Sequence, residues 1–214
     1  MATFQVQIED MVGTVGGSSS DTTAITSFLT DGAKEVINLM PPNLLRLCSS
    51  EVTLTPQAPG SESSASTLNT GKVFNVRRSD GTIDQPCRLI PAKLKGRVSD
   101  SDDMDYATAT DPVYYIESNF LNILPSSSSA VGKYSEVQYP AVAYGDSAIA
   151  TFPDELEYIV VLYAAVKGME RIITDIMGTD EDIELGNARK DQYNWLVGQY
   201  AKAVQAMTGA PAGA

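Results

Sequence analysis

The sequence predicts an α+β fold, in which both ends of the chain form a helical bundle and an antiparallel β-rich region is inserted between them. Apolar residues recur at three- and four-residue steps in two separate regions, residues 21–48 and 152–207, as they do in amphipathic helices. Between these regions apolar and polar residues alternate, which is typical of strands. The chain has 214 residues, of which 43% are hydrophobic and 20% charged, and this composition is typical of a globular domain.

The first predicted helix spans residues 22–40. Residues 1–20 precede it and are expected to form a flexible N-terminal arm that ends in a Gly- and Ser-rich link. Asp21 or Thr22 can cap the helix, because its side-chain oxygen accepts from the free N–H groups of the first turn. The helix is expected to end at Pro41-Pro42, since proline cannot donate a backbone hydrogen bond. A short helical turn over residues 43–48 follows.

Residues 50–147 are expected to form the β-rich insertion. Asp80-Gly81 separates two alternating runs and favours a hairpin, because Gly adopts positive φ without steric cost. A second hairpin is predicted over residues 113–125, and one more strand over residues 133–143, which are rich in Tyr and Val. The Ser- and Pro-rich stretch 56–69 is expected to be a loop.

Two long helices are predicted after residue 152. The first begins at Pro153, because proline is tolerated at the first helical position, and it is followed by acidic residues that suit the positive end of the helix dipole. Gly178 is placed to end this helix. Thr179 or Asp180 can cap the second helix, which runs to about Met207.

These two helices would each be about 35 to 40 Å long at 1.5 Å per residue. They are expected to expose more apolar surface than the single helix 22–40 can cover, so either the sheet or other copies of the chain must cover the rest. Trp195, the only tryptophan, lies on an apolar stripe and is expected to pack in the core. Residues 208–214 are small and are expected to form a flexible tail.

The composition argues against most catalytic chemistry. The chain contains no histidine, which removes the commonest general base and the usual zinc sites. Its two cysteines fit a protein made in a reducing cytosol, and a single disulfide between them stays an alternative. The acidic stretch 100–105 resembles a calcium loop but lacks its glycine and its final glutamate. We therefore assign no catalytic residue, metal ligand or cofactor, and expect a protein that is not an enzyme.

Charge is distributed in blocks. The net charge of −12 disfavours general binding to nucleic acid, and no apolar run is long enough to cross a bilayer. Residues 51–98 are nevertheless basic, and the acidic residues 99–111 follow them directly. These blocks are either solvated loops and edges or two opposite faces that meet between neighbouring copies of the chain.

The order of the predicted helices and strands is similar to that of a known protein family. The helix that reads Thr-Asp-Gly-Ala-Lys-Glu-Val-Ile-Asn-Leu over residues 30–39 leads into the β-rich insertion. There Pro-Val-Tyr-Tyr-Ile-Glu-Ser-Asn-Phe-Leu-Asn-Ile-Leu-Pro occupies residues 112–125, and a Tyr-Ser-x-Val-x-Tyr-Pro strand occupies residues 134–140. The next stretch, residues 152–167, reads Phe-Pro-Asp-Glu-Leu-Glu-Tyr-Ile-Val-Val-Leu-Tyr-Ala-Ala-Val-Lys and opens the following helix. Over residues 22–207 this pattern resembles the head-to-tail adaptor (neck, or connector) proteins of tailed bacteriophages.

The resemblance implies a function as well as a fold. Such proteins form rings, usually of twelve copies, that join the portal protein to the tail or the next neck protein. The ring extends the DNA channel, so DNA passes through its lumen without specific binding, and it performs no catalysis. The implied location is the neck of the virion, with synthesis in the host cytoplasm and no membrane partner. Family adaptors often dock on the portal through their C-terminal helix, here Tyr200, Val204 and Met207.

The charge blocks suggest where neighbouring copies would meet. We expect a seam in which the basic block faces the acidic block of the next copy, while the remaining acids line the channel. The expected seam residues are Lys72, Arg77, Arg78, Arg88, Arg97, Asp100, Asp102, Asp103 and Asp105. Two alternatives stay open: a phage tail terminator or tail-completion ring, which would bind the tail tube, and a hydrolase that uses only carboxylates, which would need a deep pocket holding two of them.

Overall fold

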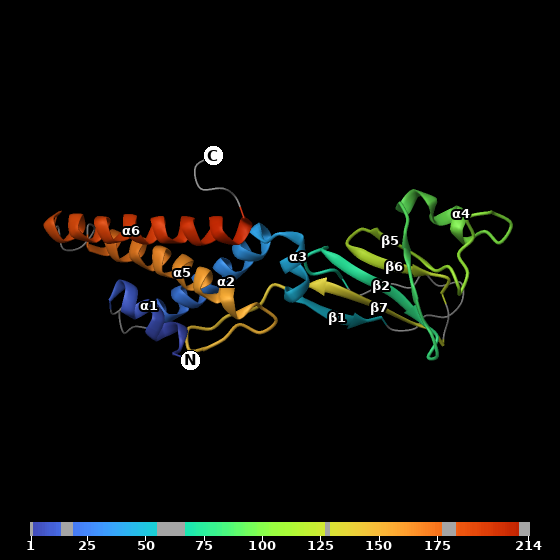
Figure 1. The fold of residues 1–214 in the computed structure, drawn as a ribbon, viewed down its shortest axis with the longest axis horizontal. Coiled ribbons are helices and arrows are strands. Elements are labelled where there is room, and N and C mark those ends of the chain that lie inside the picture. Colours follow the sequence, from blue (N-terminus) through green and yellow to red (C-terminus); the bar gives the residue numbers. More distant parts are fainter. Residues whose placement is uncertain (1, 14–18, 55–66, 127–128, 177–182, 210–214) are drawn as a thin grey trace. The chain divides into compact units, whose positions relative to one another are not determined.

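The chain folds into two units in a computed structural model that describes residues 2–13, 19–54, 67–126, 129–176 and 183–209. Met1–Cys48 and Tyr139–Ala214 form a helical unit, and Ser49–Gln138 form a β unit (Figure 1). The predicted α+β fold, with a β-rich region inserted into a helical bundle, is therefore confirmed. The insertion is shorter than expected, because it ends at Gln138 rather than at residue 147.

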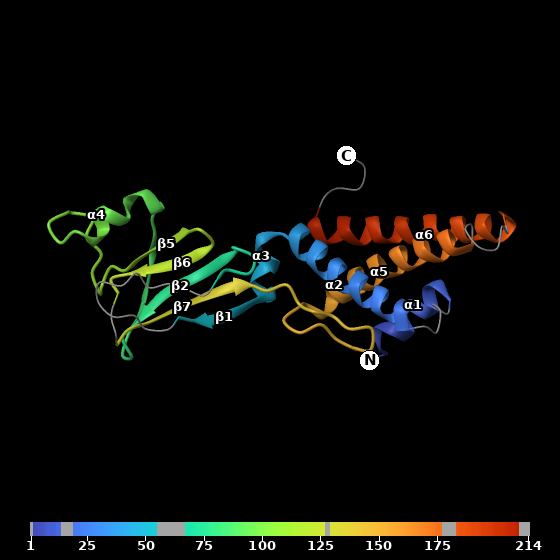
Figure 2. The same cartoon turned by 180° about the vertical axis from the view of Figure 1, so that it is seen from behind.

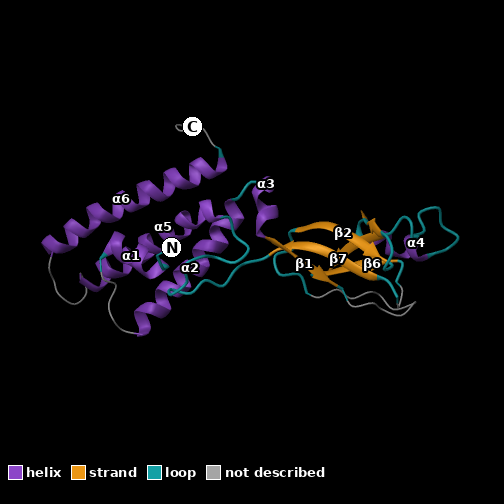
Figure 3. Ribbon diagram, turned by 60° about the horizontal axis from the view of Figure 1, so that its bottom comes forward, coloured by secondary structure: helices purple, strands orange, loops and turns teal. Residues whose placement is uncertain are grey.

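The helical unit is built around α5 (Asp154–Asp175), which packs against α1 (Phe4–Val12), α2 (Ser19–Leu39) and α6 (Ile183–Thr208). Figure 3 shows these four helices in purple. The short helices α3 (Pro42–Leu45) and η1 (Arg46–Cys48) follow α2, as the sequence predicted. Much of α5 is buried, and its fully covered side chains include Val160, Val161, Leu162, Ala164, Ala165 and Met169. The chain therefore covers α5 with its own helices.

The close approach of α2 to α5 depends on Gly32. A β-carbon at this position would lie 2.8 Å from Cδ1 of Tyr163 and 3.1 Å from its Cγ. Because real β-carbons essentially never come within 3.0 Å of a heavy atom outside their own residue and its two chain neighbours, only glycine fits here without a shift of the Tyr163 ring. Ile25, Leu29 and Ile37 of α2 complete this part of the core.

The N-terminal residues differ from the expected flexible arm. Residues 4–12 form α1, whose N-cap Thr3 accepts a hydrogen bond from the backbone N–H of Val6. Phe4, Ile8 and Val12 lie one above the other at four-residue spacing and are all buried. The arm prediction is therefore wrong for these residues, because three buried apolar side chains hold the segment on the bundle.

The described residues of the β unit form two sheets (Figure 2). One has the strand order β1-β7-β2-β3, formed by Ser49–Thr53, Val131–Val137, Val73–Ser79 and Asp84–Pro86. The other has the order β4-β5-β6, formed by Arg88–Leu89, Val113–Glu117 and Phe120–Leu124. The short helices η2 (Ala92–Leu94) and α4 (Lys95–Ser99) lie between β4 and β5 in the sequence. All pairings are antiparallel except that of β4 with β5.

Both predicted hairpins are confirmed. Asp80 closes the turn between β2 and β3, because its carboxylate accepts from the backbone N–H groups of Thr82 and Ile83, both at 3.0 Å. Ser118 and Asn119 connect β5 to β6 with positive φ angles of 52° and 67°, as a two-residue hairpin turn requires.

The strand predicted over residues 133–143 stops at Val137. Thr30 of α2 explains why the chain leaves the sheet at this point. Its hydroxyl donates to the carbonyl of Val142 at 3.2 Å and accepts from the N–H of Val142 at 3.3 Å. The backbone groups that a longer strand would have paired in the sheet are therefore bonded to a helix.

The two sheets pack face to face. Val76 and Tyr134 from the first sheet share one apolar cluster with Leu121 and Ile123 from the second, and Leu54 and Leu68 complete it. Gly132 lies where the sheets come closest, since a β-carbon there would be 2.6 Å from Cδ1 of Ile123 and 2.8 Å from Cδ1 of Leu54. A second cluster, which includes Val98, Val113 and Tyr115, packs α4 against the other face of β5.

Trp195 does not pack in the core. It is 55% exposed, whereas the next residue, Leu196, is fully buried. The inner face of α6 is set by Tyr193 and Tyr200, which contact Glu170 and Tyr163 of α5, and Trp195 lies outside that face. The prediction that Trp195 is a core residue is therefore wrong, because the apolar stripe that packs on α5 runs through Leu196 instead.

Several sequence predictions fall on residues that the structure does not describe. They are the helix end at Gly178, the cap at Thr179 or Asp180, most of the loop 56–69 and the tail beyond Gly209.

Cys48 and Cys87 are both free thiols, so no disulfide joins them.

Candidate functional site

Among the described residues, the buried carboxylates Glu136 and Glu157 each accept hydrogen bonds from backbone N–H groups. Oε1 of Glu136 accepts from the N–H groups of Thr70 at 2.8 Å and Gly71 at 3.1 Å. Oε1 of Glu157 accepts from the N–H of Ile149 at 2.5 Å. Within the described ranges, no three Cys, Asp or Glu side chains are grouped to hold a metal ion. These two carboxylates are thus explained by hydrogen bonding to the loops beside them.

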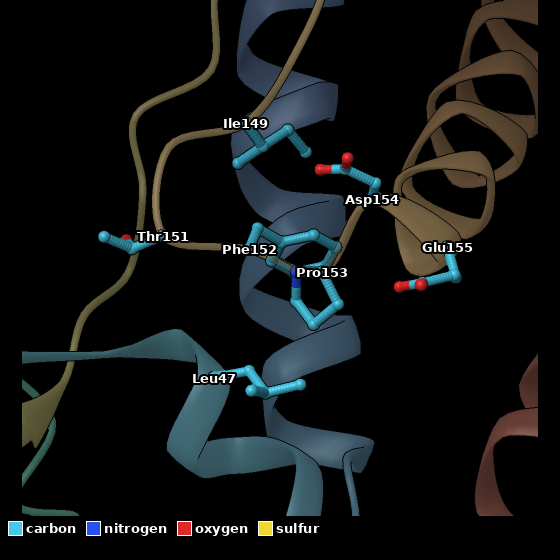
Figure 4. Close-up of a pocket in the computed structure, with 7 residues that line it drawn as sticks. All are labelled: Leu47, Ile149, Thr151, Phe152, Pro153, Asp154 and Glu155. Carbon is cyan, nitrogen blue, oxygen red and sulfur yellow. The ribbon is translucent and has the colours of Figure 1, made fainter.

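A groove of about 480 Å³ lies at the N-terminal end of α5 (Figure 4). Its apolar wall comes from Leu47 of η1 and from the segment before α5, and Asp154 and Glu155 add two carboxylates. The complete lining is Leu47, Ile149, Thr151, Phe152, Pro153, Asp154 and Glu155. Leu47 is 59% exposed, so a large apolar side chain borders the groove without being covered by the described chain.

The backbone that shapes this groove is locally strained. Thr151 has a φ of 54°, a conformation that is costly for a β-branched residue. Glu157 fixes the same segment from inside through its bond to Ile149. The segment turns sharply at this point, and Phe152 and Pro153 become part of the groove wall (Figure 4).

The predicted seam residues form many ion pairs within one chain. Arg97 contacts Asp103 at 2.9 Å and Asp105 at 3.1 Å, and Arg88 contacts Asp111 at 3.2 Å. The hydrogen bond from Arg97 lowers the pKa of Asp103 below its ordinary value. The adjacent basic and acidic blocks are therefore joined to each other at several points within the β unit.

Arg77 and Arg78 have different environments. Arg77 forms ion pairs with Glu51 of β1 and with Asp84 of β3, on a partly exposed sheet face. Arg78 is only 8% exposed, and its Nε donates to the carbonyl of Pro125 at 3.1 Å. Arg77 can thus contact a neighbouring molecule, whereas Arg78 is part of the fold.

The other seam residues lie at the surface or near it. Asp100 and Asp102 are exposed, and Oδ1 of Asp100 accepts from the N–H of Asp102 at 3.1 Å. Lys72 is partly buried at the entrance to β2. The seam stays a prediction, and its exposed members are Arg88, Arg97, Asp100 and Asp102.

The residues predicted to dock on the portal lie on α6. The Tyr200 hydroxyl donates to Oε1 of Glu35 at 2.9 Å, and the Tyr200 ring meets Tyr163 edge-on at 5.9 Å. Burial first, and then this contact with Glu35, raises the pKa of Tyr200. Val204 and Met207 are partly buried. Docking through these residues stays a prediction, and Tyr200 already serves to join α6 to α2 and α5.

Two surface features were not predicted from the sequence: the exposed Trp195 and the groove at the start of α5. The helical spacing of apolar residues alone could not show whether Trp195 or its neighbour Leu196 is buried, because both residues fit the apolar stripe equally well. The groove combines η1 with a segment about 100 residues later, so only the tertiary structure shows it.

Comparisons with known proteins identify no related protein. The sequence matches no protein-family profile, and no curated protein shows significant similarity to it.

The helices of the described residues are all too short or too polar to span a bilayer.

Proposed function

We propose that the protein is a structural subunit of a tailed-bacteriophage neck, one of about twelve copies in a ring that joins the portal to the tail and extends the DNA channel. The proposal rests on the resemblance of the sequence to head-to-tail adaptors. The observation that supports it best is the architecture, since both chain ends build a helical unit from which a β unit is inserted. Its partners would be other copies of itself, the portal protein and the next neck or tail protein.

The exposed surface also supports an assembly role. The chain covers α5 with its own helices, but α6 leaves Trp195 and Leu185 substantially exposed. Exposed aromatic and aliphatic side chains are common where proteins meet one another. The β unit adds exposed ion pairs, which can set register and partner choice between neighbouring copies.

Imaging by negative-stain electron microscopy tests this function. The purified protein is examined alone and after mixing with the portal protein encoded in the same genome. The expected result is rings with a central channel, stacked on the portal. Rings that bind the tail tube but not the portal would favour a tail terminator or tail-completion protein. Single particles that never associate with either partner would contradict the proposal.

A charge exchange tests the seam without disturbing the fold. Arg78→Glu would place a carboxylate in a buried position, so it reports on folding and not on assembly. Exchanging Arg88 and Asp111, as Arg88→Asp with Asp111→Arg, keeps their ion pair within the chain while it reverses the charges that a neighbour meets. If the seam exists, the exchanged variant should form rings less readily than the natural protein, especially at low salt. Unchanged assembly would remove these residues from the seam.

A further inference from the structure

We propose that Trp195 of one copy inserts into the groove at the start of α5 in a second copy. The contact joins two different surfaces, so repeating it from copy to copy can close a ring. This inference rests on the ring function proposed above and names one contact that would form the ring. Its two sides, the indole of Trp195 and the groove beside Leu47, both belong to the helical unit.

The chemistry of the two surfaces is complementary. The indole ring is a flat apolar group with one N–H donor, and among the described residues it has no hydrogen-bond partner. The groove offers an apolar wall formed by Phe152 and Pro153, next to carboxylates that can only accept hydrogen bonds. Asp154 and Glu155 form no ion pair with any described residue, so each remains available to accept from the indole.

The groove also matches Trp195 in size and the neighbouring Lys202 in charge. A groove of about 480 Å³ is large enough for a tryptophan side chain with room for water. Lys202 lies two turns beyond Trp195 on the same side of α6, is exposed, and forms no ion pair within the described chain. It can therefore approach the second carboxylate when the first accepts from the indole. Buried tryptophan anchors ringed by polar contacts often carry much of the energy of an interface.

Trp195 cannot reach the groove of its own chain. Tyr193 of α6 contacts Glu170, and Tyr200 contacts Tyr163, so the two antiparallel helices place Trp195 level with about residue 168 of α5. Asp154 lies about 14 residues further along that helix, which corresponds to about 21 Å at 1.5 Å per residue. A second copy is therefore needed to bring the indole and the groove together.

Mixing two variants by analytical ultracentrifugation tests the contact. Trp195→Ala removes the inserted side chain, and Leu47→Glu places a charge on the exposed edge of the groove. Each variant alone should associate about 30-fold more weakly than the natural protein. A mixture should form one-to-one pairs and nothing larger, because one intact indole and one intact groove remain available. Val197→Ala, an apolar truncation on another side of α6, serves as the control and should associate normally.

Several outcomes would overturn the inference. They are normal self-association of Trp195→Ala, no pairing in the mixture, or a natural protein that stays monomeric at its highest soluble concentration. If Trp195→Ala self-associates normally but no longer binds the portal, the portal is the occupant and the inference is wrong. Circular dichroism with a melting curve confirms that both variants fold. Rings that persist in Trp195→Ala would reject this contact while leaving the proposed neck function intact, whereas failure of the natural protein to form rings with the portal would reject that function.

Discussion

The hydroxyl of Tyr200 in α6 donates a hydrogen bond of 2.9 Å to Glu35 in α2. This bond joins the last helix of the chain to its second helix, while the Tyr200 ring rests edge-on against Tyr163 of α5. Helix α2 therefore meets α5 and α6, which come much later in the sequence, at one tyrosine. Tyr193 and Tyr144 make equivalent bonds to Glu170 and Glu9, so phenol–carboxylate pairs recur throughout the helical unit.

Tyr200→Phe should reduce the free energy of unfolding by about 1 to 2 kcal/mol, because it removes a hydrogen bond to a carboxylate and leaves Glu35 without that donor. Urea unfolding followed by circular dichroism measures the change. The ring contact with Tyr163 is retained, so the effect should be smaller than that of Tyr200→Ala. A normal stability combined with lost portal binding would instead assign Tyr200 to docking.

Gly32→Ala should destabilise the helical unit by about 1 to 3 kcal/mol, because the added methyl group collides with the Tyr163 ring. Gly198→Ala is the matched control. A β-carbon at Gly198, in α6, would meet nothing within 4 Å, so this variant should be neutral or gain up to about 1 kcal/mol from helix propensity. Thermal unfolding of both variants provides the comparison, and equal effects would contradict the close packing of α2 on α5.

Gly132→Ala should destabilise the β unit by a similar amount, about 1 to 3 kcal/mol, since its methyl group would force Ile123 and Leu54 apart. Gly96→Ala, in α4, meets nothing within 4 Å and serves as the control. Hydrogen exchange measured by mass spectrometry should show faster exchange in β6 and β7 of the Gly132 variant. Unchanged exchange there would mean that the two sheets are not packed as closely as described.

The two thiols should react slowly in the folded protein. Burial raises the pKa of Cys48 to about 11 and that of Cys87 to about 12, from 9.0 for a free thiol. Modification by a thiol reagent at pH 8 should therefore be much faster in denaturant than in buffer. Rapid labelling of both thiols in the native state would contradict their burial.

The same two pKa values predict how stability depends on pH. Because the folded pKa values exceed the unfolded ones, the protonated thiols stabilise the fold fully below about pH 9, and this contribution is lost as the pH rises through 11 and 12. Replacing Cys48 and Cys87 by Ser should therefore flatten the fall of stability above pH 9. Urea unfolding at several pH values measures the slope, and an identical slope in the double variant would contradict this assignment.

Local signals in the sequence predicted most of the fold. Pro153 marked the start of α5, because proline fixes its own φ at a helical value. Asp80-Gly81 marked the turn between β2 and β3, because Gly81 can adopt the positive φ of 92° found there. Helix α1 carried a readable signal as well, with the cap Thr3 followed by Phe4 and Ile8 at helical spacing. The Gly- and Ser-rich composition of the residues that follow it obscured that signal.

Long-range contacts could not be predicted from the sequence. The two-residue strand β4 exists only because β5, more than 20 residues later, pairs with it. Arg77 reaches across the sheet to Glu51, and no local spacing links these residues. The exposure of Trp195 depends on which side of α6 meets α5, and helical period alone does not determine that side. These features involve Arg77 and Arg88 of the predicted seam and Trp195 of the proposed contact between copies.

Native mass spectrometry of the protein mixed with its portal tests the assembly role most directly. A neck ring should give a complex that contains the portal and a fixed number of 22.9 kDa subunits, near twelve, released together as a ring when the portal dissociates. A spectrum in which the protein stays a single 22.9 kDa chain, with or without the portal, would contradict it.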